Sequence, residues 1–127
     1  MSRKAGAAIT EAELRIMRIL WASGSATVND IVAGIKKPKL ARNTVLTTLG
    51  VIERKGFATH TVDGRTFVYR PLVAQEDVRV RALDDVVARF FDSSPSQLVL
   101  RLLNSKRMTD AEAASIRALL DEHEEET

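Results

Sequence analysis

The chain has 127 residues and 45% hydrophobic content, which are ordinary values for a soluble globular fold. No apolar run approaches the roughly 18 residues of a membrane span, so we expect a cytoplasmic protein. The absence of cysteine and the wide separation of His60 and His123 exclude disulfides, thiolate metal cages and thiol nucleophiles, and we expect no metal or cofactor. Through Val73 there are twelve Lys and Arg against five Asp and Glu, and from Ala74 onward seven against twelve, so the basic first half is expected to meet a polyanion.

Two capped helices are predicted first. Thr10 and Glu13 form a capping box that begins a helix expected to run to about Ala22. Thr27 caps a second helix in the same way, and Pro38 closes it because the residue before a proline disfavours the helical conformation. The apolar faces that should pack the core are Ile9, Ala12, Ile16, Ile19 and Leu20 in the first helix and Val28, Ile31, Val32 and Ile35 in the second.

The segment 41–57, ARNTVLTTLGVIERKGF, predicts a third helix that ends at Gly56. It is crowded with β-branched residues, which lose rotamer freedom in a helix, so something other than helix propensity must favour them there. Val45, Leu49 and Ile52 cluster on one side as the core face. The outward face carries a row of Asn43, Thr47, Gly50 and Arg54, with Thr44 and Val51 beside it and Leu46 on its other flank.

A β-hairpin is predicted next, in FATHTVDGRTFVYRPL at residues 57–72. Asp63 and Gly64 lie between two β-rich runs, which is the strongest short-range signal for a two-residue turn, and Arg65 would lie at the tip. In that register one apolar face of the hairpin carries Ala58, Val62, Phe67 and Tyr69.

Three further helices are predicted after the hairpin. From Gln75 an apolar stripe recurs at near-heptad spacing, and Ser94 then caps a short helix with Pro95 at its first position. The LVLRLL run of that short helix, residues 98–103, is apolar nearly all round, so we expect it to be buried. Thr109 caps the last helix, which ends in the acidic tail DEHEEET.

Three helices followed by a two-stranded hairpin is the element order of a winged helix-turn-helix, whose third helix enters the major groove of DNA. We therefore expect a mainly α (α+β) protein, with a winged-helix DNA-binding domain in residues 1–73 and a three-helix dimerisation domain in residues 74–127. On the third helix, threonine offers a hydroxyl and a methyl group to base edges, asparagine can bond adenine, and glycine permits close approach. The predicted DNA contacts are Lys39, Arg42, Asn43, Thr44, Leu46, Thr47, Arg54, Lys55 and Arg65.

Residues after Val73 are expected to form a homodimer. Three amphipathic helices alone can hardly bury both faces of LVLRLL and the preceding apolar stripe, whereas two copies can. A two-fold pair would also match a palindromic operator with half-sites about one helical turn apart. The predicted dimer contacts are Val80, Leu83, Val87, Phe90, Phe91, Leu98, Leu102, Ile116, Leu119 and Leu120.

Two other function classes are weighed against DNA binding. An enzyme needs convergent groups, but His60, His123 and the Asp84-Asp85 pair lie on separate predicted elements, so no catalytic site is predicted. A winged helix can also bind protein, because fold alone does not decide function. Such a module should expose apolar anchors on its third helix, and here only Leu46 and Val51 qualify. The threonine row also lacks the Glu/Lys pairs that decorate a merely solvated helix.

Four segments carry a family resemblance: ITEAELRIMRILW, NTVLTTLGVIERKGF, VDGRTFVYRPLV and LVLRLLNSKRMTDAEAASIRALL. In order and spacing, over nearly the whole chain, they resemble the BlaI/MecI family of bacterial repressors of β-lactamase and related genes. The resemblance implies a winged-helix DNA-binding domain, a helical dimerisation domain, a palindromic double-stranded operator, and inactivation by proteolysis after a membrane sensor detects a β-lactam. It places the family's operator contacts on Thr44 and Thr47, with Asn43 where the family often has lysine.

The chain also departs from the family pattern. Leu46 and Val51 stand where such repressors often carry arginine, and Ala41-Arg42 replaces the usual Ser-Pro, so the family's operator sequence does not carry over to this chain. The resemblance implies cleavage in the helix that matches 98–103, where Arg101-Leu102 takes the place of the family's Asn-Phe bond. Copper-responsive relatives bind Cu(I) through C-terminal cysteines, and this chain has none. Because no polar cluster interrupts the predicted apolar stripes, we expect release from DNA by loss of the dimer and not by a small ligand.

Overall fold

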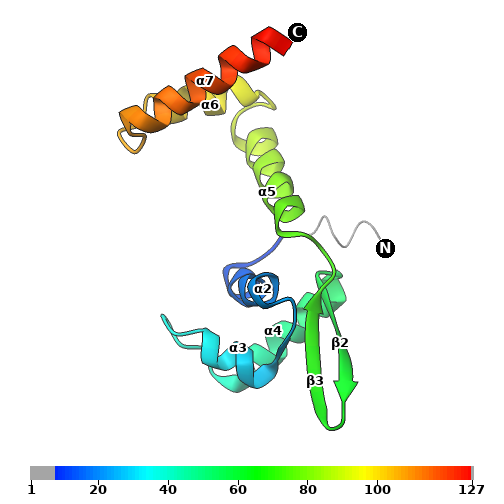
Figure 1. Ribbon diagram of the computed structural model, residues 1–127. Helices are drawn as coiled ribbons and strands as arrows, with labels where there is room; N and C mark the ends of the chain where they lie inside the picture. Colours follow the sequence, from blue (N-terminus) through cyan, green and yellow to red (C-terminus); the bar gives the residue numbers. More distant parts are fainter. Residues whose placement is uncertain (1–7, 127) are drawn as a thin grey trace. The chain divides into compact units, whose positions relative to one another are not determined.

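The computed structural model describes residues 8–126. The chain divides into two compact units, one that ends at Ala82 and one that begins at Leu83, and this division falls inside helix α5 (Gln75–Phe90). The expected domain boundary between Val73 and Ala74 stays a prediction. Helices dominate, and the order of three helices, a hairpin and three more helices confirms the predicted fold class (Figure 1).

The first two helices begin at the predicted caps. Helix α2 (Glu11–Ser23) follows Thr10, whose hydroxyl oxygen accepts from the Glu13 amide at 3.2 Å while the Glu13 carboxylate accepts from the Thr10 amide at 3.0 Å. Helix α3 (Val28–Gly34) repeats this arrangement with Thr27 and Asp30, at 3.1 Å and 3.0 Å. Each box satisfies amide groups that a helix start leaves without an intrahelical partner.

Helix α4 (Arg42–Lys55) is the predicted third helix, and Gly56 ends it in the left-handed conformation at φ 83°. Val45, Leu49 and Ile52 are fully buried, which confirms the predicted core face. Burial of this face outweighs the lower helix propensity of its two β-branched residues, Val45 and Ile52. The core that it joins consists of Ile16, Met17, Leu20, Ala26, Val28, Ile31, Ile35, Val45, Leu49, Ile52, Phe57, Ala58 and Tyr69.

The sheet has three strands in the order β1-β3-β2, so the predicted two-stranded hairpin is present and a third strand, β1, was not predicted. Strands β2 (Ala58–Asp63) and β3 (Thr66–Pro71) form the hairpin, which we call the wing (Figure 1). Strand β1 (Ala26–Thr27) pairs with the other edge of β3. A strand of two residues is too short to show an alternating pattern in the sequence. Its pairing depends on a contact between segments far apart in the chain.

The turn of the wing also differs from the prediction by one residue. Asp63 pairs with Thr66, so the two loop residues are Gly64 and Arg65 instead of Asp63 and Gly64. Gly64 has φ 65°, and a positive φ at the first loop position favours glycine. Arg65 lies at the tip as predicted. The predicted apolar face is confirmed by register, because residues 62 and 67 pair, as do 60 with 69 and 58 with 71.

Helices α6 (Pro95–Leu103) and α7 (Asp110–Glu126) follow α5, as predicted. Ser94 caps α6 by accepting from the Gln97 amide, and Thr109 caps α7 through a reciprocal box with Glu112. The expectation that α6 is buried is wrong for the single chain. No residue of α5 or α6, both described throughout, is buried, and large apolar side chains on both helices are exposed. None of the helices in residues 8–126 is long and apolar enough to cross a membrane.

Candidate nucleic-acid interface

The outward face of α4 is polar and accessible. Asn43, Thr44, Leu46 and Thr47 are exposed on the side opposite the core residues, where the sequence predicts them. Thr48 donates its hydroxyl to the Thr44 carbonyl at 2.7 Å, which satisfies that hydroxyl within the helix. The exposed hydroxyls of Thr44 and Thr47 and the amide of Asn43 can bind a ligand along this face.

Cations flank this face at its N-terminal end. The loop before α4 carries exposed Lys36, Lys37 and Lys39, with an isolated bridge between the first and last of these. Arg15 of α2 donates to the Pro38 carbonyl and so holds the loop against the first helix. Arg42, at the first turn of α4, donates to the Asn29 side-chain oxygen of α3. The predicted contacts Lys39 and Arg42 thus share one end of the exposed face.

Lys55, which the sequence groups with the DNA contacts, has a different environment. Its ammonium lies 2.8 Å and 3.0 Å from the two carboxylate oxygens of Glu13 and 2.9 Å from the Ala8 carbonyl oxygen. The Glu13 side chain is only 4% exposed, so this ion pair is largely buried. The geometry favours a structural role for Lys55, and its DNA contact stays a prediction. The sequence did not predict this ion pair, because the capping box with Thr10 already accounts for an acidic residue at position 13. Arg54, the neighbouring predicted contact, is exposed.

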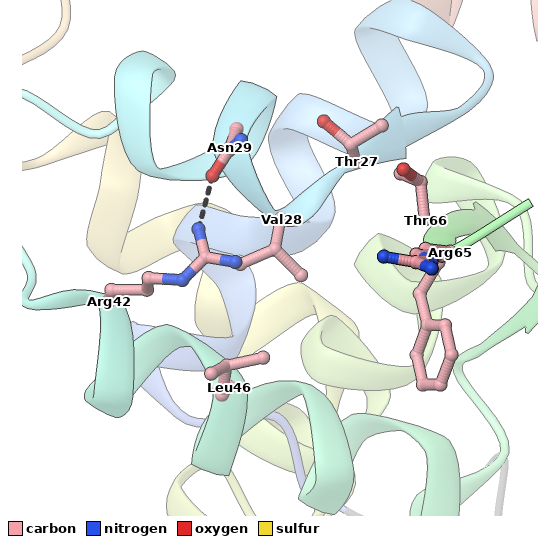
Figure 2. Close-up of a pocket in the computed structure, with 8 residues that line it drawn as sticks. Thr27, Val28, Asn29, Arg42, Leu46, Arg65 and Thr66 are labelled. Carbon is pink, nitrogen blue, oxygen red and sulfur yellow. Dashed lines mark hydrogen bonds between the residues drawn. The ribbon is translucent and has the colours of Figure 1, made fainter.

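A groove separates the first turns of α3 and α4 from the tip of the wing (Figure 2). We call it the helix–wing groove, and its volume is about 310 Å³. It is open to solvent. Arg42 and Arg65 approach from opposite sides, the first from α4 and the second from the wing. The lining residues are Thr27, Val28, Asn29, Arg42, Leu46, Arg65, Thr66 and Phe67.

A side-chain hydrogen bond connects α4 with the wing. His60 of β2 lies with its Nδ1 atom 2.8 Å from a carboxylate oxygen of Glu53, and its ring stacks on Phe67 at 4.4 Å between centroids. The Tyr69 ring is tilted against the same imidazole at 5.1 Å between centroids. Burial raises the pKa of the Tyr69 phenol, and the negative charge of Glu53 raises it further. His60 is half-buried on a strand, as its sequence position suggests, but its partner on α4 was not predicted.

Within residues 8–126, no three His, Asp or Glu side chains come together as a metal site. The arrangement around α4 is instead a polar helix face with cations at both its N-terminal end and the wing tip. Such a surface can donate hydrogen bonds to base edges and to phosphate oxygens.

Comparison with known proteins identifies the family. The model of the family described as "Penicillinase repressor" matches residues 9–122. The chain belongs to the penicillinase repressor family. Members of this family are transcriptional repressors, and the predicted resemblance to BlaI/MecI proteins is thereby confirmed.

Individual relatives of the penicillinase repressor family match over most of their length. The penicillinase repressor of Bacillus licheniformis is 27% identical over 116 residues, 91% of this chain and 91% of that protein. The methicillin resistance regulatory protein MecI of Staphylococcus aureus strain N315 is 25% identical over 114 residues, 89% of this chain and 93% of that protein. The solution structure of the DNA-binding domain of the repressor BlaI has 31% identity and a TM-score of 0.50, covering 54% of this chain and 85% of that one.

Proposed function

We propose that the protein represses transcription by binding a double-stranded palindromic operator with α4 in the major groove, as a homodimer in the cytoplasm. The observation that carries the proposal is the exposed face of α4, where Asn43, Thr44 and Thr47 project opposite a fully buried core face. The only acid in α4 is Glu53, and His60 pairs with it. The part of α4 that carries the exposed Asn43, Thr44 and Thr47 therefore holds no carboxylate that would repel the phosphates of DNA.

Salt dependence and base preference test the DNA-binding part of the proposal. Mobility-shift titrations against the promoter of the chain's own gene should show affinity that falls steeply with added salt, as counterions are released. Thr47→Ala should relax sequence preference, whereas Lys39→Ala should weaken binding to all DNA alike. Lys106→Ala is the matched control, because this exposed lysine lies between α6 and α7. Equal binding at low and high salt would contradict phosphate contact.

The exposed apolar faces of α5, α6 and α7 support the homodimer. Phe90, Leu100 and Leu119 are 67%, 58% and 63% exposed in the single chain. A hollow of about 390 Å³ is lined by Phe90, Phe91, Gln97, Leu100, Arg101 and Asn104, and its three apolar residues can pack against side chains of a second copy. Contiguous exposed apolar surface of this kind marks an association site. Light scattering that finds a monomer at concentrations on the order of tens of micromolar would contradict the dimer.

We also propose that repression ends by proteolysis in α6, through a membrane sensor-protease system that responds to β-lactams. Arg101 and Leu102, the residues at the position of the expected cut, are both exposed. A cut there would separate α7 from the rest of the chain and remove its apolar face from the dimer. Immunoblots of the native host during β-lactam challenge should show a fragment that ends near Arg101. Full derepression with the chain intact would contradict this mechanism.

The alternative, a winged helix that binds a protein partner, has one observation in its favour. Leu46 and Phe67 expose apolar surface on the same side of the first unit, beside the helix–wing groove. Genome-wide capture of bound DNA separates the two functions. A recurring palindromic sequence supports the repressor, whereas capture with no enriched sequence supports the protein-binding module.

A further inference from the structure

We propose that Glu53 and His60 are positioning residues, which hold the wing where Arg65 at its tip meets the operator. This inference rests on the proposed function, because it concerns how the wing reaches the same duplex that α4 reads. Neither residue is among the predicted DNA contacts, and neither needs to touch DNA itself. Their role is to fix one DNA-binding element against another.

The wing is anchored in the core at its base, and its outer part extends into solvent. Ala58 of β2 and Tyr69 of β3 are 2% and 5% exposed, whereas every residue from 61 to 67 is exposed. His60 pairs with Tyr69 in the register and is half-buried, so it lies at the level where the hairpin leaves the core. A two-stranded hairpin has little stability of its own in water. The direction of the outer part therefore depends on contacts at this level.

Glu53 supplies such a contact from the last turn of α4. The imidazole Nδ1 atom of His60 lies 2.8 Å and 2.9 Å from the two carboxylate oxygens of Glu53. A carboxylate only accepts hydrogen bonds, so Nδ1 carries the donated proton whether the imidazole is neutral or charged. The same ring stacks on Phe67 at 4.4 Å between centroids, with 15° between the ring planes. His60 of β2 thus joins α4 to β3, and the link holds both strands of the wing.

The charge of Glu53 makes the two interpretations of this residue distinguishable. Glu53 is the only acid in α4, and a negative charge near DNA repels phosphates. Hydrogen bonds to a charged acceptor are stronger than those between neutral groups, so a carboxylate holds the imidazole better than an amide would. Charge alone predicts that removing the carboxylate strengthens binding to DNA. Loss of support for the wing predicts that the same change weakens it.

Affinity for one DNA probe tests the proposal. The probe is a duplex of about 40 base pairs, long enough for two half-sites, that the full chain enriches from a random-sequence library. His60→Phe keeps a ring for stacking and removes the donor, so binding should weaken about three- to tenfold, the range of one lost hydrogen bond. His60→Asn places an amide N–H near the position of Nδ1 and should restore most of the affinity. Glu53→Ala should weaken binding by a similar factor, although it removes a negative charge.

A double-mutant cycle with Arg65→Gln separates positioning from folding. If His60 acts through Arg65, then His60→Phe should weaken binding by less than about twofold in a chain that already carries Arg65→Gln. A general loss of folded protein would instead lower affinity by the same factor in both backgrounds. Thr10→Ala is the stability control, because it removes the cap of α2 outside the wing. This variant should melt at a lower temperature and bind the probe like the wild type while it is folded.

Four outcomes would overturn the inference while leaving the proposed function in place. His60→Phe that binds like the wild type would remove the role of the hydrogen bond, and tighter binding by Glu53→Ala would mean that only its charge matters. If the losses from His60→Phe and Arg65→Gln multiply, or if Arg65→Gln binds like the wild type, His60 does not act through the wing tip. If the library yields no enriched sequence, the proposed function itself fails and this inference fails with it.

Discussion

Replacing Lys55 with methionine removes the cation of the buried ion pair and keeps most of the side-chain volume. Glu13 would retain the Thr10 amide as a donor but lose its only charged partner. Breaking a buried pair from one side costs about 3–5 kcal/mol, and the Lys55 side chain is 24% exposed, so water offsets part of that cost. We therefore expect the free energy of unfolding to fall by about 2–3 kcal/mol at neutral pH.

Denaturant titration followed by tryptophan fluorescence measures this change in the first unit. Trp21 is the single tryptophan of the chain, and its indole donates to the Val73 carbonyl at 2.8 Å. Arg54→Met, the neighbouring substitution at an exposed site, should change stability by less than about 0.5 kcal/mol. Adding Glu13→Gln to Lys55→Met should restore most of the loss, because the amide oxygen can still accept from Thr10 and no buried charge remains.

The same variants decide between a structural and a phosphate-binding role for Lys55. Loss of one phosphate contact lowers the slope of log affinity against log salt by about 0.9. We expect Arg54→Met to lower this slope and Lys55→Met to leave it unchanged under conditions where both variants are folded. A Lys55→Met variant as stable as wild type, with a slope reduced by about 0.9, would refute the reasoning.

Three further predictions concern the helices and their caps. Gly50→Ala should stabilise the fold by about 0.5–1 kcal/mol, because the nearest contact of the added methyl is at 3.6 Å, and should weaken DNA binding, because that methyl lies on the DNA-facing row. Gly34→Ala places a methyl 2.9 Å from the end of the Ile19 side chain, which must shift, so this variant should gain less stability than Gly50→Ala in the same melting assay. Leu100→Glu should dissociate the dimer in sedimentation experiments, and Val62→Glu should not, although the two side chains are 58% and 59% exposed; dissociation by both would place the interface elsewhere. The Thr27 hydrogen bonds lower the pKa of Asp30 below 3.8 in the folded chain, so the Asp30 carboxylate stabilises the fold above that pH, and this stabilisation is lost as the pH falls through the folded pKa. Asp30→Asn should therefore be less stable than the wild type at pH 7, and the difference should close below about pH 3.8. A difference in stability that does not depend on pH would contradict this origin.

Local patterns in the sequence determined most of the secondary structure and the face that α4 turns to solvent. The capping boxes at Thr10, Thr27 and Thr109 were predictable because each involves residues only three positions apart. The core face of α4 was predictable because helical periodicity is a property of neighbours within two turns. The family resemblance likewise depended on order and spacing along the chain.

The tertiary structure decided the contacts between segments that are far apart in sequence. Glu13 meets Lys55 across 42 positions, so a residue that the sequence groups with the DNA contacts also forms half of a buried ion pair. Strand β1 forms only because Ala26 reaches Tyr69, and the turn moved by one residue because the register follows cross-strand pairing as well as the Asp-Gly signal. The sequence shows that the run 98–103 is apolar enough to need burial, but the single chain leaves it exposed. Periodicity specifies which face must be covered, whereas the covering surface depends on how whole elements, and by our proposal two chains, pack in three dimensions.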